Sequence, residues 1–246
     1  MGEFLRCSMG LSAWKQYGNS RWALRVNPSS GNLHPTETYI VRDGQVSHYA
    51  VKEHALEHRG TLPVPATAGS FLVALTSIHW REARKYGERA YRYCQHDAGH
   101  AIAALRLSAA MLGWRLRLLE DWSSDQVAAL LGVDRDDDFA DAEREEPECL
   151  AVVWTGVETG VWTGDAMATD PGLLVDAARR GVWQGRANRL SADRMDWPVI
   201  DEVAHATRTL GRTVAPPHHR SLAQCPFVDP PTPQRHRLRP EWRAAP

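Results

Sequence analysis

The sequence predicts an α+β protein, and three observations lead to this class. Short apolar runs rich in β-branched residues, which are typical of buried strands, occur at 38–41, 71–78 and 149–154. A proline-free, alanine-rich segment at 81–113 has the composition of a helical region. Strands and helices follow one another without the regular alternation that marks a parallel α/β sheet.

Length and charge narrow the function classes. With 246 residues the chain can bury a sizeable core, as one large domain or as one domain with appendages. Its formal net charge of −1 gives no argument for nucleic acid or an anionic membrane as a partner. No apolar run reaches membrane-spanning length, and the first ten residues lack the apolar core of a secretory signal.

The cysteines point to a reducing compartment. The four of them are scattered without paired spacing, which disfavours a disulfide framework or a zinc ribbon, so we expect a cytoplasmic protein. They are Cys7, Cys94, Cys149 and Cys225.

The first elements are a mixed N-terminal stretch and a β-hairpin. Residues 1–24 are short and mixed, with Trp14 and Trp22 expected as anchors. Strands at 38–41 and 46–51 follow, and an Asp-Gly turn between them predicts a hairpin.

The middle of the chain predicts the clearest elements. The continuous apolar run 71–78 predicts a buried strand. Residues 98–112 have apolar side chains at helical spacing, and Gly113 is a suitable stop. The alternating run 115–119 predicts another strand, and Ser123–Gln126 has the form of a capping box that opens a helix to Leu131. The remaining expected elements are a solvated acidic loop at 134–148 and a buried strand at 149–154. Two helices are expected after them, at 171–180 and 196–208.

The C-terminal part differs in composition. Eight of the fifteen prolines lie beyond residue 215, so regular elements are not expected there. We therefore predict one domain at 1–211 and a proline-rich tail at 212–246, which is a linker, an extension or a disordered end.

One short segment suits a ligand better than a core. Residues 25–37, Arg-Val-Asn-Pro-Ser-Ser-Gly-Asn-Leu-His-Pro-Thr-Glu, gather small hydroxyls, two asparagines, a glycine and two prolines just before an apolar run. Such a turn offers backbone N–H groups and short polar side chains at a rigid edge. It suits the rim of a flat ligand rich in heteroatoms.

A basic stripe follows on the helix expected from residue 81. Its members fall within an arc of about 100° on a regular helix. Like charges at this spacing cost about 0.2–0.5 kcal/mol per pair, so protein carboxylates or a bound anion should offset them. A solvated charged face is the plain alternative. The stripe consists of Arg81, Lys85, Arg89, Arg92, His96 and His100.

Lys85 and Tyr86 are candidates for proton transfer. A lysine and a tyrosine that lie close together lower each other's cost of ionisation. As neighbours in a regular helix they diverge by about 100°, but they can meet in an irregular turn. The alternative is a surface lysine next to a packing tyrosine.

His96 and His100 have the spacing of a helical zinc motif. Asp97 stands where the general-base glutamate would be, no third ligand is evident, and the flanking residues are basic. We therefore expect no metal site and keep a zinc hydrolase only as a third hypothesis.

Two motifs together carry a family resemblance. Asn27–Pro35, followed by Thr-Glu-Thr-Tyr-Ile-Val, resembles the P-S-S-x-N-x-Q-P turn and strand of the FMN-dependent nitroreductase family. Residues 80–100 with 109–113 resemble the thiazole/oxazole-forming (azoline) dehydrogenase branch, in which a K-Y-G-x-R-x-Y-R segment leads into a G-H helix. The resemblance covers about 20–160 and continues more loosely to about 208.

The resemblance implies a nitroreductase-like α+β fold with a mostly antiparallel central sheet flanked by helices. It also implies FMN bound between two copies of the fold, either in a homodimer or with a second nitroreductase half, and a small-molecule or peptide substrate. The catalytic pair would be Lys85 and Tyr86, and the cofactor-binding residues would be Arg25, Pro28, Ser29, Ser30 and Asn32.

Three departures bear on the cofactor. In place of the family's R-R-S-x-R segment, which holds the FMN phosphate, the sequence has only Leu5-Arg-Cys-Ser8. His34 replaces the family glutamine, and the C-terminal basic segment is not recognisable. The leading hypothesis is an FMN-dependent oxidoreductase that contributes part of a shared site. The second is a catalytically incomplete half-domain that acts as a dimerisation or scaffold module.

Overall fold

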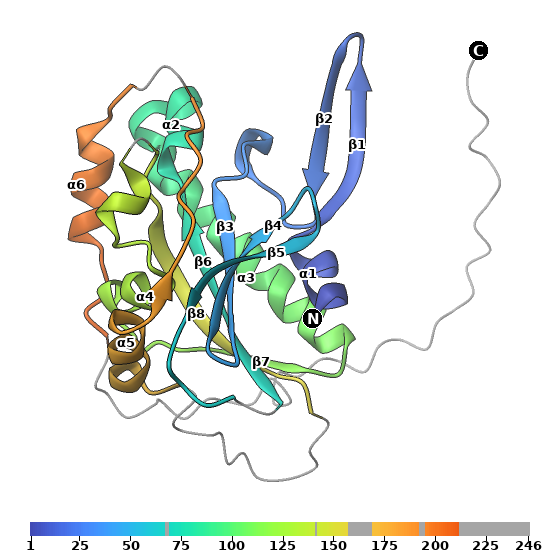
Figure 1. Cartoon of the computed structure of the whole chain (residues 1–246). Coiled ribbons are helices and arrows are strands. Elements are labelled where there is room, and N and C mark those ends of the chain that lie inside the picture. Colours follow the sequence, from blue (N-terminus) through green and yellow to red (C-terminus); the bar gives the residue numbers. More distant parts are fainter. Residues whose placement is uncertain (67–68, 141, 157–168, 192–194, 212–246) are drawn as a thin grey trace, which may run out of the picture. The chain divides into compact units, whose positions relative to one another are not determined.

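An antiparallel sheet forms the centre of the protein. The computed structural model describes residues 1–66, 69–140, 142–156, 169–191 and 195–211. In these residues seven strands form one sheet, and every neighbouring pair is antiparallel, which confirms the α+β class and the mostly antiparallel sheet (Figure 1). In spatial order they are β7 (Arg115–Leu118), β8 (Glu146–Trp154), β6 (Ser70–Ser77), β3 (Thr36–Arg42), β4 (Gln45–Ala50), β5 (Ala55–Thr61) and β9 (Val182–Trp183).

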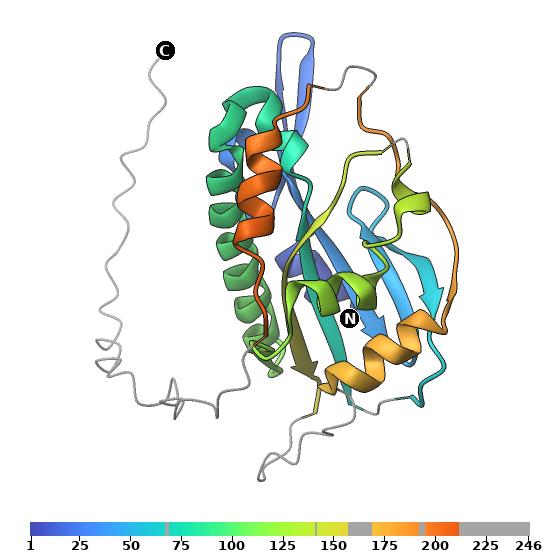
Figure 2. The same cartoon turned by 90° about the vertical axis from the view of Figure 1, so that its left-hand side faces the viewer.

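Helices cover both faces of this sheet. They are α1 (Gly2–Ser8), α2 (His79–Tyr86), α3 (Ala90–Met111), α4 (Ser124–Leu131), α5 (Pro171–Arg179) and α6 (Pro198–Ala206). Helices α1 and α3 pack together on one face, and α4 and α5 cover the other (Figure 2). Helix α2 continues directly from the end of β6 and packs, with α6, against the start of α3.

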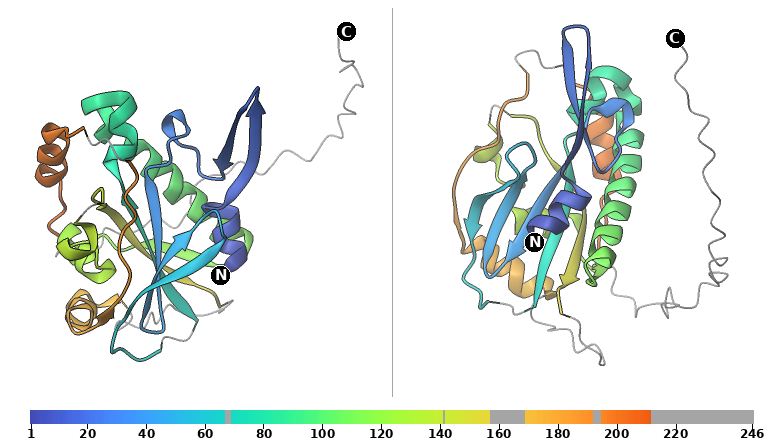
Figure 3. Two further views of the ribbon diagram at one scale, coloured as in Figure 1. Left: turned by 45° about the horizontal axis from the view of Figure 1, so that its top comes forward. Right: turned by 90° about the vertical axis from the view of Figure 1, so that its right-hand side faces the viewer.

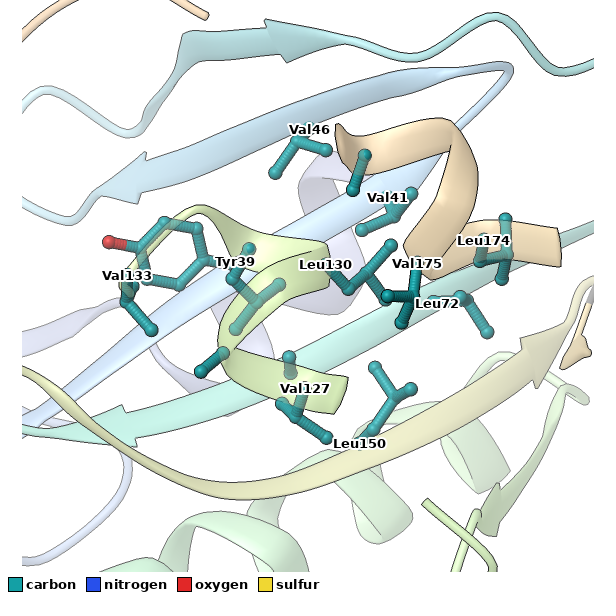
Figure 4. Packing of buried hydrophobic residues seen from close by; sticks show 14 of the residues in the cluster. Tyr39, Val41, Val46, Leu72, Val127, Leu130, Val133, Leu150, Leu174 and Val175 are labelled. Atoms are coloured by element: carbon teal, nitrogen blue, oxygen red, sulfur yellow. The ribbon is translucent and has the colours of Figure 1, made fainter. Parts of the chain in front are cut away.

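Strand β6 is buried on both faces, which explains its continuous apolar run. Phe71, Val73 and Leu75 contact the layer formed by α1 and α3, whereas Leu72 and Ala74 face α4 and α5. This alternation follows from the two-residue period of a strand. Figure 4 shows the second of these cores, where the side chains of α4 and α5 lie over the sheet.

Two local signals in the sequence are confirmed. The Asp-Gly turn joins β3 to β4, and Asp43 and Gly44 both take positive φ angles, of 51° and 74°, as a tight hairpin turn requires. The capping box at the start of α4 forms in both directions. The Ser123 hydroxyl accepts from the Gln126 amide at 3.1 Å, and the Ser123 amide donates to the Gln126 side chain at 2.9 Å.

The expectation for the N-terminal tryptophans is wrong. Residues 11–25 form a hairpin, β1 (Leu11–Tyr17) and β2 (Ser20–Arg25), that projects away from the large sheet (Figures 1 and 3). Trp14 is 52% exposed and Trp22 is 37% exposed, because none of the described residues forms a second layer over the hairpin.

The helix expected from residue 81 is not continuous. Helix α2 ends at Tyr86, a short 3-10 turn η2 (Gly87–Arg89) follows, and α3 begins at Ala90. Gly87 has φ 58° and ψ −140°, a conformation open to glycine alone, and this breaks the helix. The basic stripe is therefore divided among α2, η2 and α3, with Arg81 and Lys85 on α2, Arg89 on η2 and the remaining three on α3.

The acidic segment 134–148 is not a solvated loop throughout. It contains the 3-10 turn η3 (Asp136–Phe139) and the first residues of β8. Asp138 is buried and accepts from Arg59, which is 79 residues away, at 3.3 Å as well as from the nearby Arg135 at 3.0 Å. Glu145 accepts hydrogen bonds from the hydroxyls of Tyr39 and Thr76 at 2.9 and 2.7 Å. Distant partners stabilise these carboxylates inside the fold.

The helices predicted at 171–180 and 196–208 correspond to α5 and α6. The predicted tail, 212–246, lies outside the described residues, so the division at residue 211 stays a prediction. None of the helices in the described ranges is long and apolar enough to cross a membrane.

Candidate functional site

The polar turn between β2 and β3 has an unusual backbone. It contains a short 3-10 turn η1 (Ser30–Asn32), and Gly31, Asn32 and His34 all have positive φ angles, of 60°, 60° and 52°. Glycine adopts this region freely and asparagine tolerates it better than most residues. The local sequence therefore supports a compact loop at the edge of the sheet.

Asp97 of α3 holds this turn in place. Its carboxylate is fully buried and accepts from the Ser29 hydroxyl at 2.7 Å and from the Ser30 hydroxyl at 3.0 Å. It also accepts from the Ser30 amide, at 3.0 and 3.1 Å to its two oxygens. The Ser29 hydroxyl in turn accepts from the His34 amide at 2.8 Å. Both serine hydroxyls are thus engaged by the protein itself.

Gly31 brings the turn against the catalytic candidates. A Cβ atom placed on Gly31 would lie 2.6 Å from Lys85 Nζ and 2.7 Å from the Tyr86 hydroxyl. The two polar atoms therefore converge on one point directly over the Gly31 backbone. Any side chain at residue 31 would collide with these two atoms, so glycine allows Lys85 and Tyr86 to lie against the turn.

Lys85 and Tyr86 meet because helix α2 ends at Tyr86. Tyr86 has φ −111° and ψ −2°, which departs from the regular helix at the start of η2. The Lys85 ammonium lies 5.2 Å from the centroid of the Tyr86 ring, and that ring packs against Tyr93 with centroids 4.3 Å apart. Lys85 is exposed and Tyr86 is half-buried, so both polar ends can reach a ligand.

The other predicted cofactor residues brace the turn from within. The Asn32 side-chain amide donates to the Ala23 carbonyl at 2.9 Å, and its oxygen accepts from His34 Nε2 at 2.8 Å. Arg25 donates to the Thr36 carbonyl at 2.9 Å, and burial lowers the pKa of its guanidinium. Pro28 is exposed at the outer side of the turn. The roles of these residues as cofactor ligands stay predictions.

A buried ion cluster fixes the far end of the turn. Arg81 donates to the His34 carbonyl at 2.7 Å and pairs with Glu37, which also accepts from His48 at 2.7 Å. Burial raises the pKa of Glu37, but the His48 bond and the charges of Arg81 and Arg25 outweigh it and hold this pKa at about 2. Burial lowers the pKa of His48, and its bonds to carboxylates outweigh this and raise it to about 9. Part of the basic stripe is therefore offset by a protein carboxylate.

His96 and His100 are both exposed on α3. In the part of the chain that the structure describes, no group of three histidine, cysteine or carboxylate side chains is arranged to hold a metal ion.

Asp97 and Glu37 are the residues that sequence reasoning missed. Asp97 lies at a face otherwise lined by alanines, and a charged residue on an apolar helix face is the signal that could have indicated a buried partner. Glu37 is charged in a strand whose other residues are largely buried, which is a comparable signal.

The described residues fit the ring of a flavin better than its phosphate. An ammonium and a phenol lie together against the Gly31 backbone, and both are groups that can bond to the heteroatoms of such a ring. The weak counterpart of the phosphate segment lies on α1, where Ser8 is buried and donates to the Phe4 carbonyl, and Arg6 lies 3.7 Å from Glu3. These two residues of the segment are therefore engaged within α1.

Gly31 and Lys85 are both exposed at this edge. Four cavities, of about 340, 110, 690 and 190 Å³, are lined by other residues and include neither Gly31, Lys85 nor Tyr86. A planar group at this edge would be enclosed only if a further surface covered it.

The nitroreductase family model matches residues 19–142, which is half of the chain and includes both the turn and the Lys85–Tyr86 segment. The chain belongs to the nitroreductase family. The search of curated protein sequences returned no match.

Solved structures share the fold of this nitroreductase-family chain. A protein of Anabaena variabilis assigned as a nitroreductase superposes with a TM-score of 0.54 and 23% identity, over 66% of this chain and 36% of that one. A chain of the E. coli microcin synthetase McbBCD complex, solved with truncated pro-MccB17 bound, superposes with a TM-score of 0.51 and 18% identity. The match covers 64% of this chain and 63% of that one. This nitroreductase-family chain therefore spans about a third of the first protein and less than two thirds of the second. At these identities the likeness shows the fold alone.

Proposed function

We propose that the chain is an FMN-dependent oxidoreductase of the azoline dehydrogenase type and that it contributes one edge of a flavin site shared with a second copy of the fold. The observation that carries this proposal is the convergence of Lys85 Nζ and the Tyr86 hydroxyl over the side-chain-free Gly31. Membership of the nitroreductase family supports a flavin, and the exposed edge supports a second copy as its cover. A cytoplasmic location belongs to the same proposal.

The chain's own residues have separable tasks at this edge. Asp97 holds Ser29 and Ser30, so the Gly31 backbone stays in place against the ligand. Lys85 and Tyr86 give or take a proton at the edge, as positioned acids and bases do. A bound flavin would supply the hydride acceptor, and the protein supplies orientation and electrostatics.

The substrate is proposed to be a peptide or small molecule with an azoline ring. Its oxidation to an azole removes a hydride and a proton, so an acceptor and a base must lie on the same edge. The McbBCD structure, with truncated pro-MccB17 bound, supports a peptide among these substrates.

Titration with FMN tests the proposal. We expect the purified dimer to bind FMN, seen as quenched flavin fluorescence and a shifted absorption band. Lys85→Met and Tyr86→Phe should keep the flavin and lose at least about a hundredfold in turnover of an azoline peptide, the usual contribution of a general acid or base. Lys52→Met, at an exposed site, is the matched control and should behave as the wild type.

A scaffold or dimerisation module is the second candidate, and it is favoured by the weak counterpart of the phosphate segment, whose Ser8 and Arg6 are engaged within α1. A stable dimer that fails to bind FMN would support this candidate and overturn the first. The proline-rich segment 212–246 is proposed to be a linker or extension in either case.

A further inference from the structure

The β1–β2 hairpin presents large apolar side chains to solvent. Tyr17 is 84% exposed, and Trp14 and Trp22 are exposed as well. The hairpin projects from the rest of the fold, and no second layer among the described residues covers it (Figure 3). Exposed apolar side chains that gather in one place mark interaction surfaces.

The strand register distributes these side chains over both faces of the hairpin. Residues directly opposite each other share a face, and the faces alternate along each strand. Arg21 lies on the face of Trp14, with its guanidinium carbon 4.5 Å from the centroid of the ring. Lys15 is opposite Trp22 on the other face, which Tyr17 shares. Each face therefore carries one tryptophan and one cation.

The charge of this region is positive throughout. Residues 4–36 contain no aspartate or glutamate, although the whole chain has a net charge of −1. Lys15 and Arg21 are both exposed on the hairpin. A complementary partner therefore brings negative charge of its own. The hairpin of a second copy is disfavoured, because like charges of the two copies would lie against each other.

Strand β1 also has an edge without a neighbour. Among the described residues β1 pairs with β2 alone, and six of its seven residues are exposed. The main-chain groups on its outer side are therefore available to another strand. The outer edge of β2 is partly used, because the Ala23 carbonyl accepts from the Asn32 side chain at 2.9 Å. An extended peptide bonds to a free strand edge through its own main chain.

We propose that the outer edge of β1 binds an extended acidic peptide segment by strand addition. The main chain of the peptide continues the ladder, and its side chains alternate between the two faces. Carboxylates on one face then lie beside Lys15, and apolar side chains on the other lie beside Trp14. The partner is a segment in which acidic and apolar residues alternate. The binding needs no flavin, so it is independent of the proposed function.

Fluorescence anisotropy with labelled octapeptides tests this inference on the full chain. A fluorescein-labelled octapeptide of alternating glutamate and valine should bind saturably, and more weakly as salt is raised. Alternating lysine and valine reverses the charge and should not bind. Alternating glutamate and proline keeps the charge but removes main-chain donors and disfavours strand pairing. It should bind at least about tenfold more weakly, because several hydrogen bonds are lost.

A charge reversal on β1 locates the site. Lys15→Glu places a like charge beside the peptide, so we expect the affinity for the glutamate–valine octapeptide to fall at least about tenfold. Lys52→Glu changes the net charge equally at an exposed site outside the hairpin and should bind as the wild type does. Equal affinities of the two variants overturn the inference.

The remaining outcomes identify other partners. A labelled oligothymidylate that binds more tightly than the glutamate–valine octapeptide assigns the surface to single-stranded nucleic acid and overturns the inference. A dimer that dissociates in Lys15→Glu, measured by analytical ultracentrifugation, assigns the edge to a second copy and also overturns it. The comparison of the three octapeptides on the wild type decides the matter even where a variant folds poorly.

FMN titration of the same sample separates this inference from the proposed function. If the peptide binds and FMN does not, the proposed function fails and the peptide site stands. If FMN binds and none of the octapeptides does, the peptide site alone fails.

Discussion

Asp97 accepts hydrogen bonds from both the amide and the hydroxyl of Ser30, each at 3.0 Å, across 67 residues of sequence. Together with the bond from the Ser29 hydroxyl, these hydrogen bonds hold the β2–β3 turn against α3, and we call this set of bonds the Asp97 latch. The serines of the turn therefore position its backbone, and Gly31 is left as the surface that meets Lys85 and Tyr86. The geometry of the candidate site depends on this latch.

Asp97→Asn tests the latch. The asparagine side chain has one acceptor oxygen, whereas the donors of Ser29 and Ser30 share two oxygens of Asp97. Its NH₂ group would face a serine hydroxyl. Hydrogen bonds to a charged group contribute about 1.5–3 kcal/mol, so we expect the free energy of unfolding to fall by about 2 kcal/mol or more. Denaturant unfolding of this variant and of Asp137→Asn, at an exposed site, makes the measurement. Equal stability of the two variants would contradict the latch.

A comparison of Gly31→Ala with Gly18→Ala separates the effect of backbone strain from an effect on the candidate site. Gly31 and Gly18 have similar φ angles, of 60° and 56°, but a Cβ on Gly18 would have nothing within 4 Å. Both substitutions should cost about 1–2 kcal/mol of stability through the left-handed conformation. Only Gly31→Ala displaces the Lys85 and Tyr86 side-chain ends, so only it should impair flavin binding and turnover.

Calorimetry and FMN titration of both variants check this prediction. The prediction is wrong if Gly18→Ala weakens FMN binding as much as Gly31→Ala does. It is also wrong if Gly31→Ala leaves binding and turnover at the wild-type level.

His48 makes stability depend on pH on the alkaline side. Its pKa rises from 6.5 to about 9 on folding, so the folded state binds more protons in this window. The contribution is fully present below pH 6.5 and is lost as pH rises through 9, at up to about 1.4 kcal/mol per pH unit. His48→Gln should flatten the pH dependence of the unfolding free energy between these values. His205→Gln, at an exposed site on α6, should leave it unchanged.

Ser123→Ala tests the capping box of α4. The hydroxyl accepts from the Gln126 amide at 3.1 Å, and its loss leaves an unsatisfied donor at the helix start. We expect a loss of about 1 kcal/mol in the unfolding free energy. Because α4 lies over the core and away from Lys85, FMN binding should not change. Ser20→Ala, at an exposed site on β2, is the control for serine removal.

Local patterns in the sequence were sufficient for several elements. The Asp-Gly hairpin, the strand β6 and the capping box of α4 were predicted because each depends on residues within a few positions of one another. The family resemblance also brought together the turn and the Lys85–Tyr86 pair as parts of one site.

The tertiary structure decided the rest, because partners far apart in the chain determine which charges are buried. Glu145 lies inside the fold because the hydroxyls of Tyr39 and Thr76 donate to it. The sequence of its own segment, 134–148, predicts a solvated acidic loop instead. Trp14 is exposed because no layer within the described part of the chain covers its hairpin, although tryptophan alone suggests a core. Only the fold shows that Asp97 engages the serines and that Gly31 faces Lys85. The sequence by itself determined which residues could form the site, and the packing of α2 and α3 decided how they meet.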